Sequence, residues 1–237
     1  GYITGFPNDT VESIRRDIEI IKKELPVDLL EFFFLTPLPG SEDHQKLTRE
    51  NVQLDPDLNR YDLNHVCAPH PKMSRADWER AYQVAWDTYY TDEHMDTVLR
   101  RLAAKRANVA NAVTLLTWFK GSINVEKIHP LEGGVFRFKF RRDRRPGLPI
   151  VPRWKFYPRY VAETLVKISK WVAIYWKLHR TYDRIRNDPR RFEYNDLALT
   201  PVTDDDVENL EMFHTRSAEA FVAREQRRHH PAPVAVA

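Results

Sequence analysis

The fold class follows from the opening stretch Gly1-Tyr2-Ile3-Thr4-Gly5-Phe6-Pro7, which predicts a buried β-strand ending in a glycine–proline turn. Residues 8–10 then open a helix. A second apolar strand follows at 29–35 and runs into a proline-rich turn at 36–40. Together these segments predict one βαβ unit, in which two parallel strands are joined by a helix.

A single βαβ unit cannot enclose its own sheet, because parallel sheets are normally covered on both faces. Everything after residue 41 reads as helical or irregular, so the sequence offers no further strands. We therefore expect the missing strands to precede Gly1 and the chain to be the C-terminal piece of a larger domain. The predicted fold class is an α/β remnant followed by a mainly α-helical C-terminal extension.

The composition indicates the location of the protein and the kind of partner that it binds. The mean hydropathy is -0.58 and no run approaches the roughly 20 apolar residues of a membrane span. A single cysteine, Cys67, permits no internal disulfide, so a cytoplasmic location is expected. The net charge is only +3, but arginines are dense between 137 and 159, which indicates an anionic partner there.

Four parts are expected along the chain. They are the βαβ unit at 1–41, a connecting loop at 42–73 with a short helix near 42–50, a mainly helical domain at 74–226, and a disordered tail at 227–237. Within the helical domain we expect helices over 74–119, a loop rich in Gly and Pro at 121–158, and a helix from Arg159 to about Arg186. Residues 136–141 alternate in the manner of a strand or ribbon.

The first helix has a distinct start and one apolar side. Asp9 lies three residues before Glu12, which is a capping-box-like spacing, and Thr10 is a second candidate cap. The apolar positions recur at helical period, and Pro26 ends the helix. The strand at 29–35 is almost continuously apolar, which predicts cover on both faces.

These residues carry a resemblance to a known family. The stretch 1–10, taken together with Leu35-Thr36-Pro37-Leu38-Pro39-Gly40-Ser41, resembles the fifth strand, fifth helix and sixth strand of the radical S-adenosylmethionine enzymes. The subgroup with an N-terminal cobalamin-binding domain is the most similar. The match is specific over about the first 41 residues, and the helices up to Arg106 are similar only in style to the extension of that subgroup.

The resemblance implies site residues and cofactors. Gly1, Ile3 and Gly5 would lie against the adenosyl part of S-adenosylmethionine, and the backbone of residues 36–38 would contact the adenine. The second set consists of Thr36, Pro37 and Leu38. Asn8 departs from the family pattern, which often has Glu there, and this puts that contact in doubt.

The resemblance also implies a partial TIM-like (β/α) barrel with a 4Fe-4S cluster. The Cys-x-x-x-Cys-x-x-Cys loop that holds the cluster in the family is absent from this chain, so we expect no iron incorporation and no radical chemistry by the chain alone. Cobalamin is left open as a further cofactor. The expected reaction class is methyl transfer or carbon-skeleton modification of a lipid or secondary metabolite.

Physical reasoning from the residues agrees with a ligand at this end. In parallel α/β structures ligands sit at the carboxyl ends of strands, and both turns follow strands. Glycine at positions 1 and 5 permits a planar group to approach the backbone. The acidic Asp9 at the helix start argues against phosphate.

His65, Cys67 and His70 have metal-like spacing, with Asp62 nearby. A structural metal site needs about four ligands, and a second Cys or His pair is lacking. An ordered loop is therefore favoured over a metal site. Contact of these three side chains with substrate is kept as a hypothesis.

The arginine-rich segment alternates with aromatic residues and leads into a helix with an apolar side. The members of that side are Val161, Leu165, Ile168, Trp171, Val172, Tyr175 and Trp176. We rank packing against the rest of the protein first, peripheral contact with the inner face of a membrane second, and nucleic-acid binding third. The alternative to a radical enzyme is thus a non-catalytic module that binds a membrane surface or protein partner through this face.

Overall fold

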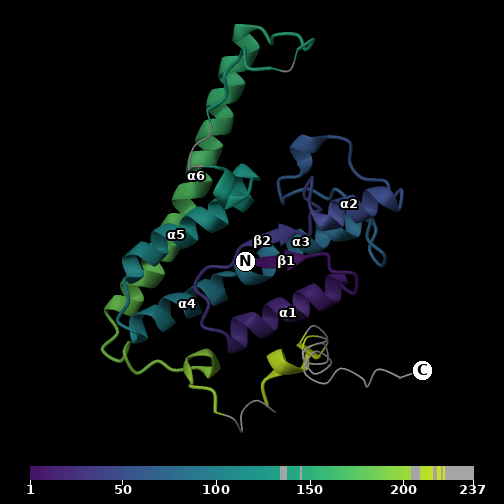
Figure 1. The fold of residues 1–237 in the computed structure, drawn as a ribbon. Coiled ribbons are helices and arrows are strands. Elements are labelled where there is room, and N and C mark those ends of the chain that lie inside the picture. The colour runs from purple at the N-terminus through teal and green to yellow at the C-terminus, as the bar shows by residue number, and fades with distance from the viewer. Residues whose placement is uncertain (134–137, 145, 204–208, 216–217, 220, 222–237) are drawn as a thin grey trace, which may run out of the picture. The chain divides into compact units, whose positions relative to one another are not determined.

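The computed structural model describes residues 1–133, 138–144, 146–203, 209–215, 218–219 and 221. These residues are mainly helical and contain one two-stranded parallel sheet, and the chain divides into two compact units. Unit 1 comprises residues 1–89 and 195–237, and unit 2 comprises residues 90–194 (Figure 1).

The βαβ unit of the prediction is confirmed in unit 1. Strand β1 (Tyr2–Thr4) and strand β2 (Phe32–Phe34) pair in parallel, with Tyr2 opposite Phe32 and Thr4 opposite Phe34. Helix α1 (Val11–Glu24) connects them. The second strand is shorter than the apolar run at 29–35 suggested, because only three of its residues pair with β1. A partial barrel is not seen in the described residues, whose sheet has two strands.

Helix α1 begins at the second of the two candidate caps. The Thr10 hydroxyl accepts a hydrogen bond from Ser13 N–H at 3.1 Å, and Ser13 Oγ accepts one from Thr10 N–H at 2.9 Å. Asp9 faces the other way, toward the end of β1. The apolar side of α1 buries Ile14 and Ile18 completely.

The core of unit 1 is an aromatic cluster between the sheet and helix α3 (Arg75–Tyr89). Phe32 meets Trp86 edge-on with ring centroids 5.0 Å apart, and Phe34 stacks on Tyr82 at 4.4 Å. Helix α3 also packs along α1. Residues 74–89 therefore belong with the βαβ unit, so the division of the chain differs from the one expected at residues 41 and 73.

The connection and the C-terminal segment complete unit 1. The connection contains α2 (Glu42–Arg49), as predicted, and the 3-10 turn η1 (Leu58–Arg60). The segment that begins at Asn195 belongs to unit 1 and forms the short turns η4 (Leu197–Leu199) and η6 (Glu211–His214). Buried Glu24 at the end of α1 holds η6, because its carboxylate accepts the N–H groups of residues 211 and 212, each at 2.9 Å.

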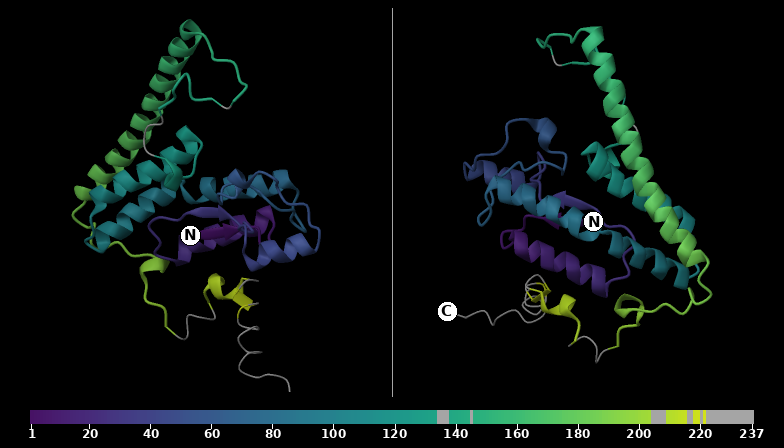
Figure 2. Two further views of the ribbon diagram at one scale, coloured as in Figure 1. Left: turned by 45° about the horizontal axis from the view of Figure 1, so that its top comes forward. Right: turned by 180° about the vertical axis from the view of Figure 1, so that it is seen from behind.

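The described residues of unit 2 are mainly helical (Figure 2). Helices α4 (Asp92–Ala104) and α5 (Val109–Gly121) both pack against the long helix α6 (Arg153–Arg186). A π-helical turn (Ser122–Glu126) continues α5 and is followed by η3 (Pro130–Glu132). Within this unit, the N-terminal half of α6 extends past the end of α5 and carries the loop 138–152 at its end.

Helix α6 begins earlier than the predicted start at Arg159, so part of the expected loop 121–158 is helical. Pro158 was expected to be the last residue of that loop, but it lies in the second turn of α6, where it removes one backbone hydrogen bond. The N–H groups of residues 155 and 156 both donate to the Pro152 carbonyl, which fixes the first turn. The alternating stretch 136–141 lies partly, and the tail 227–237 wholly, outside the described residues.

The apolar side of α6 corrects another expectation. Packing against the rest of the protein was ranked first for this side, yet only Trp171 of its members is buried. Val161, Leu165, Val172 and Trp176 are all exposed, as are the remaining two members. The 3.6-residue period revealed which residues share a side of the helix, but the helix has a separate side that faces α4 and α5.

Candidate functional site

The carboxyl ends of β1 and β2 lie next to each other at one edge of the sheet. Leu35 N–H donates to the Thr4 carbonyl at 2.8 Å, which extends the parallel ladder one residue beyond β2. The Thr4 hydroxyl donates to the Phe33 carbonyl at 3.1 Å, and the Thr36 hydroxyl donates to the Phe34 carbonyl at 3.1 Å. The turns that follow the two strands, 5–9 and 36–40, are therefore held as neighbours.

The two faces of the sheet are covered differently. Tyr2 and Thr4 point toward the helices, since the Tyr2 hydroxyl donates to Asp17 of α1 at 2.8 Å and Thr4 is fully buried. Side chains alternate along a strand, so Ile3 lies on the opposite face. Ile3 is 42% exposed, and its neighbour Phe33 is half-buried. One face of the sheet is therefore covered by helices, and the other is partly open.

Gly5 is required by a contact within the protein. Its φ of +105° is a conformation that favours glycine. A Cβ atom there would lie 1.9 Å from Cζ2 of Trp78, and Trp78 is itself buried. The Trp78 indole N–H donates to the Thr4 carbonyl at 3.3 Å. Position 5 thus permits an indole ring of α3, and not a bound cofactor, to lie directly against the backbone.

Asp9 occupies the hydrogen-bond donors that a strand-to-helix turn could offer to an anion. Its Oδ2 accepts the N–H of Gly5 at 2.8 Å and the N–H of Phe6 at 2.9 Å. A phosphate at this turn would have to displace a carboxylate of like charge. This geometry agrees with the sequence argument against phosphate.

The connection at 42–73 closes over the β1 turn. His70 Nε2–H donates to the Phe6 carbonyl at 2.9 Å, and the ring packs at 5.2 Å from the Trp78 ring. His70 Nδ1 accepts the backbone N–H groups of Lys72 and Met73. Both ring nitrogens of His70 therefore have protein partners.

His65 and Cys67 point to partners of their own. His65 Nδ1 lies 2.8 Å from Asp62 Oδ2, and the buried Cys67 thiol donates to the Arg60 carbonyl at 3.0 Å. Burial raises the pKa of the Cys67 thiol, and the nearby Asp55 carboxylate raises it further. In the part of the chain that the structure describes, no group of three or more His, Cys, Asp or Glu side chains could hold a metal ion. The three ligand-type residues are thus not brought together.

An open groove of about 420 Å³ runs along the free edge of β1. Its lining includes Ile3, Phe6, Asp17 and Met212. At its side, burial raises the pKa of Tyr2 far above the ordinary tyrosine value, and the Asp17 charge adds to this effect. Burial also raises the pKa of Asp17, although the hydrogen bond from Tyr2 works to lower it.

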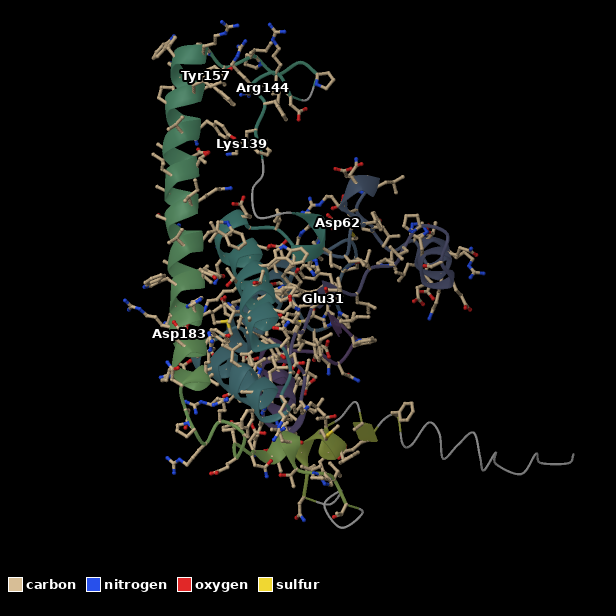
Figure 3. All side chains as sticks on the ribbon, turned by 90° about the vertical axis from the view of Figure 1, so that its left-hand side faces the viewer. Glu31, Asp62, Lys139, Arg144, Tyr157 and Asp183 are labelled. Carbon is tan, nitrogen blue, oxygen red and sulfur yellow. The ribbon has the colours of Figure 1, made fainter. Side chains whose placement is uncertain are left out.

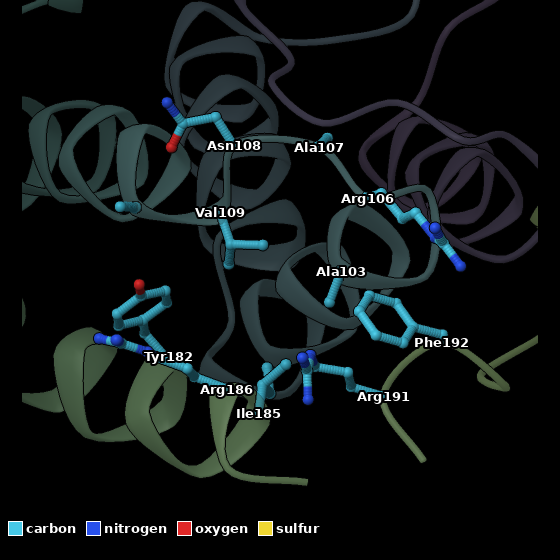
Figure 4. Close-up of a pocket in the computed structure, with 11 residues that line it drawn as sticks. Ala103, Arg106, Ala107, Asn108, Val109, Tyr182, Ile185, Arg186, Arg191 and Phe192 are labelled. Atoms are coloured by element: carbon cyan, nitrogen blue, oxygen red, sulfur yellow. The ribbon is translucent and has the colours of Figure 1, made fainter. Parts of the chain in front are cut away.

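A second hollow, of about 390 Å³, lies within unit 2 where α4 turns into α5 beside the C-terminal end of α6 (Figure 4). Two of the arginines that line it contact an aromatic ring. The Phe192 ring has the guanidinium groups of Arg106 and Arg191 at 5.0 and 4.3 Å from its centroid. These cation–π contacts hold the turn that follows α6.

The structure brings together only part of the site that the sequence predicted. Gly5 and the residues 36–38 meet at the carboxyl ends of the strands, with Pro37 buried and Leu38 46% exposed. Ile3 lies one step back on the open face. Gly1 lies at the opposite end of β1, about 13 Å from Gly5 along an extended strand, and its Cβ would meet the Phe33 ring.

Trp78 is the residue of this region that the sequence did not nominate. It was assigned to the apolar side of a helix beginning at 74, which is correct, but its contact with Gly5 joins residues far apart in the chain. A glycine that ends a strand indicates that something approaches the backbone. It does not indicate whether a ligand or a side chain does so.

Comparison with known proteins adds no relative. No family model matches the chain, no curated protein is significantly similar to it, and no solved structure matches its fold. The geometry described above and the residues of the two turns are therefore the basis for a functional proposal.

Proposed function

We propose that this chain is the C-terminal portion of a radical S-adenosylmethionine enzyme, in which it forms part of the cofactor-binding wall and a cap over the substrate. The observation that carries the proposal is the pairing of the two family-like turns. The turns 5–9 and 36–40 follow adjacent parallel strands and lie at the same edge. Helices cover one face of these strands, while Ile3 remains exposed on the other.

The residues of the open face fit an adenosyl group in part. Ile3 and Leu38 offer exposed apolar surface to a planar base, and the backbone of residues 36–38 offers hydrogen-bonding groups. Gly5 does not fit a direct contact, because Trp78 covers it. Its proposed role is to fix the turn through that indole. Gly1, at the other end of the strand, would contribute only to the lumen wall.

The cluster cannot be assigned to this chain. Cys67 is its single cysteine, and the described residues contain no metal-binding group. We propose that residues preceding Gly1 supply the Cys-x-x-x-Cys-x-x-Cys loop and the remaining strands of a partial barrel. With the cluster bound, the cofactor would supply a 5′-deoxyadenosyl radical that abstracts a hydrogen atom from the substrate.

The chain's own residues would position the cofactor and exclude water. The connection 42–73 is fastened to the β1 turn by His70 and by Lys72, whose ammonium donates to Asn8 Oδ1 at 2.9 Å. This fastening would keep a cap in place over the carboxyl ends of the strands, where ligands of parallel α/β proteins bind. Methyl transfer or carbon-skeleton modification of a lipid or secondary metabolite is the proposed reaction class, with cobalamin as a candidate cofactor.

The test begins with the reading frame upstream of Gly1. A Cys-x-x-x-Cys-x-x-Cys loop is expected within the couple of hundred residues that precede it. The complete protein, reconstituted anaerobically with iron and sulfide, is expected to cleave S-adenosylmethionine reductively to 5′-deoxyadenosine. A frame that starts beside Gly1, or a complete protein that forms no 5′-deoxyadenosine, would refute the proposal.

Variants of the complete protein test the wall itself. Ile3→Glu and Leu38→Glu each place a carboxylate on the surface proposed for the adenosyl group. Each is expected to weaken S-adenosylmethionine binding by at least about tenfold, the factor that 1.4 kcal/mol gives. Leu131→Glu is the control, because Leu131 is also exposed but belongs to unit 2 and lines neither of the hollows described above. Equal effects of all three variants would contradict the assignment.

A further inference from the structure

Helix α6 has two apolar sides, and only one of them is used within unit 2. The inner side is buried against α4 and α5 and consists of Trp171, Leu178 and Ile185, each seven residues from the next. The other side, here called the outer stripe, is exposed. Its members are Trp154, Tyr157, Val161, Leu165, Ile168, Val172, Tyr175 and Trp176.

The outer stripe is continuous along the helix. At 100° per residue, its members fall within about 50° of a common line, and this line is about 110° around the helix from the inner side. From Trp154 to Trp176 the stripe is about 33 Å long. Trp154 is 72% exposed, Leu165 is 62% exposed and Trp176 is 57% exposed. Such a large exposed apolar surface indicates a binding face.

Two basic side chains lie at the edge of the stripe. The Lys155 ammonium is 4.9 Å from the centroid of the Trp154 ring, and the Arg180 guanidinium is 5.6 Å from that of Trp176. Glu163 is the one acidic residue between 153 and 177 in the sequence. Its carboxylate is already paired with Arg159 at 2.8 Å and with Lys139 at 2.7 Å. Glu163 therefore does not offset the two positive charges at the edge of the stripe.

The loop at the N-terminal end of α6 adds further exposed apolar and basic side chains. This loop, residues 138–152 and here called the tip, exposes Phe138, Phe140, Leu148 and Ile150 among arginines. Figure 3 shows Lys139, Arg144 and Tyr157 at this end of α6 and Asp183 near the other. The tip thus continues the combination of apolar and basic side chains past the first turn of the helix.

We propose that the outer stripe and the tip dock onto an anionic phospholipid bilayer, with α6 lying in the plane of the interface. Trp and Tyr, which make up half of the stripe, are the side chains that prefer the boundary between headgroups and acyl chains. The flanking ammonium and guanidinium groups match a negatively charged headgroup layer. Within the part of the chain that the structure describes, no helix is long and apolar enough to cross a membrane.

A second copy of the chain is a poorer occupant of this surface. Two stripes packed in parallel would bring together the basic side chains at their edges and the arginine-rich tips of the two copies, and like charges at close range repel. Bulky Trp and Tyr side chains also differ from the Leu, Ile and Val that interlock at helical seams. A bilayer accepts both the aromatic rings and the positive charge.

The experiment uses the chain as it stands with vesicles of phosphatidylcholine, with or without about 30 mol% phosphatidylglycerol. Cosedimentation is expected to be at least about tenfold stronger with the anionic lipid, because each basic residue near such a surface contributes about fivefold in affinity. Binding is expected to weaken as salt is raised. Brominated lipid is expected to quench the fluorescence of Trp154 and Trp176.

Two matched pairs of variants separate the contributions. Trp154→Ser combined with Trp176→Ser removes stripe rings, and Leu58→Ser combined with Leu131→Ser removes equally exposed apolar groups elsewhere. Arg142→Glu combined with Arg144→Glu reverses the tip charge, and Arg49→Glu combined with Arg190→Glu does so at other exposed sites. The stripe and tip variants are expected to lose binding by at least about tenfold, and the controls to retain it. Circular dichroism of every variant verifies folding.

Several results would overturn the inference. They are equal binding to neutral and anionic vesicles, equal losses in test and control variants, a stable dimer broken by the stripe variant, or tight binding of single-stranded nucleic acid in place of lipid. None of these results depends on radical chemistry. A complete protein that forms 5′-deoxyadenosine but does not bind vesicles would refute the membrane inference alone. A protein that binds vesicles but forms no 5′-deoxyadenosine would refute only the proposed enzyme function.

Discussion

Replacing Gly5 by alanine tests the packing that organises the candidate site. The added Cβ would lie 1.9 Å from Cζ2, 2.2 Å from Cε2 and 2.6 Å from Nε1 of Trp78. These are ring atoms of a side chain that is almost fully buried, so they cannot swing aside as the end of a flexible chain would. The glycine φ of +105° adds strain for any residue with a side chain.

The magnitude follows from these two contributions. An unfavourable positive φ costs about 1–2 kcal/mol, and overpacking of a filled core typically costs about 1–3 kcal/mol. Gly5→Ala is therefore expected to lower the free energy of unfolding of unit 1 by about 2–5 kcal/mol. With a urea m-value of about 1–3 kcal/mol/M, the midpoint is expected to fall by roughly 1 M or more.

Gly40→Ala is the matched control. Gly40 also has a positive φ, +89°, but a Cβ there would have no atom within 4 Å. Its cost is therefore expected to be the backbone strain alone, about 1–2 kcal/mol. The difference between the two variants measures the clash with the indole.

A double-mutant cycle identifies the obstructing group. Trp78→Leu removes the ring atoms near Gly5 while it keeps an apolar side chain at the position. In that background Gly5→Ala is expected to cost no more than Gly40→Ala does in the wild-type chain. If Gly5→Ala costs as little as the control in the wild-type chain, or costs the same with and without Trp78, the packing argument is wrong.

Three further changes test other parts of the structure. Gly121→Ala is expected to lower the melting temperature of unit 2, because the added Cβ would lie 2.2 Å from the buried Trp171 ring. This clash is expected to outweigh the preference of a helix for alanine over glycine, which is about 1 kcal/mol. A raised melting temperature would contradict the contact. Glu24→Ala removes the acceptor of two backbone N–H groups. It is expected to lower the free energy of unfolding by about 1–3 kcal/mol and to speed hydrogen exchange across η6. Substitution of the exposed Glu19 by alanine is the control and is expected to have neither effect. Because burial raises the pKa of Cys67, the thiolate fraction of this side chain at pH 8 is lower than that of an ordinary thiol. Iodoacetamide is therefore expected to react slowly with Cys67 until the pH is raised or urea is added. Alkylation at the rate of a free thiol would show that the pKa is not raised.

The sequence predicted what depends on short-range periodicity. The βαβ unit, helix α2 and the helices between 74 and 119 followed from apolar spacing and turn residues, and all are present. The choice between Asp9 and Thr10 as the cap of α1 did not follow. Each has a polar residue three positions later that can complete a capping box. Only the structure reveals that Asp9 instead accepts the N–H groups of Gly5 and Phe6.

The failures have physical causes that a single sequence does not reveal. Pro158 is a helix breaker by propensity, but near a helix start its missing N–H costs one hydrogen bond. The apolar side of α6 was assigned to packing because such sides usually face a core. Helical period alone cannot distinguish a side that faces neighbouring helices from one that faces solvent. The Trp78–Gly5 contact is missed for a similar reason, since it depends on tertiary structure.

The edges of the sheet connect the fold to the proposed function. The outer edge of β2 is closed by the connection, because Phe34 N–H donates to the Leu63 carbonyl at 2.8 Å. Among the described residues, no backbone hydrogen bond reaches the outer edge of β1 at Ile3. The C-terminal segment comes near this edge at Met212, but it is fastened to Glu24 of α1 and leaves the groove open. In the proposed complete enzyme, a further strand would occupy that groove, pair with β1 and extend the open face beside Ile3.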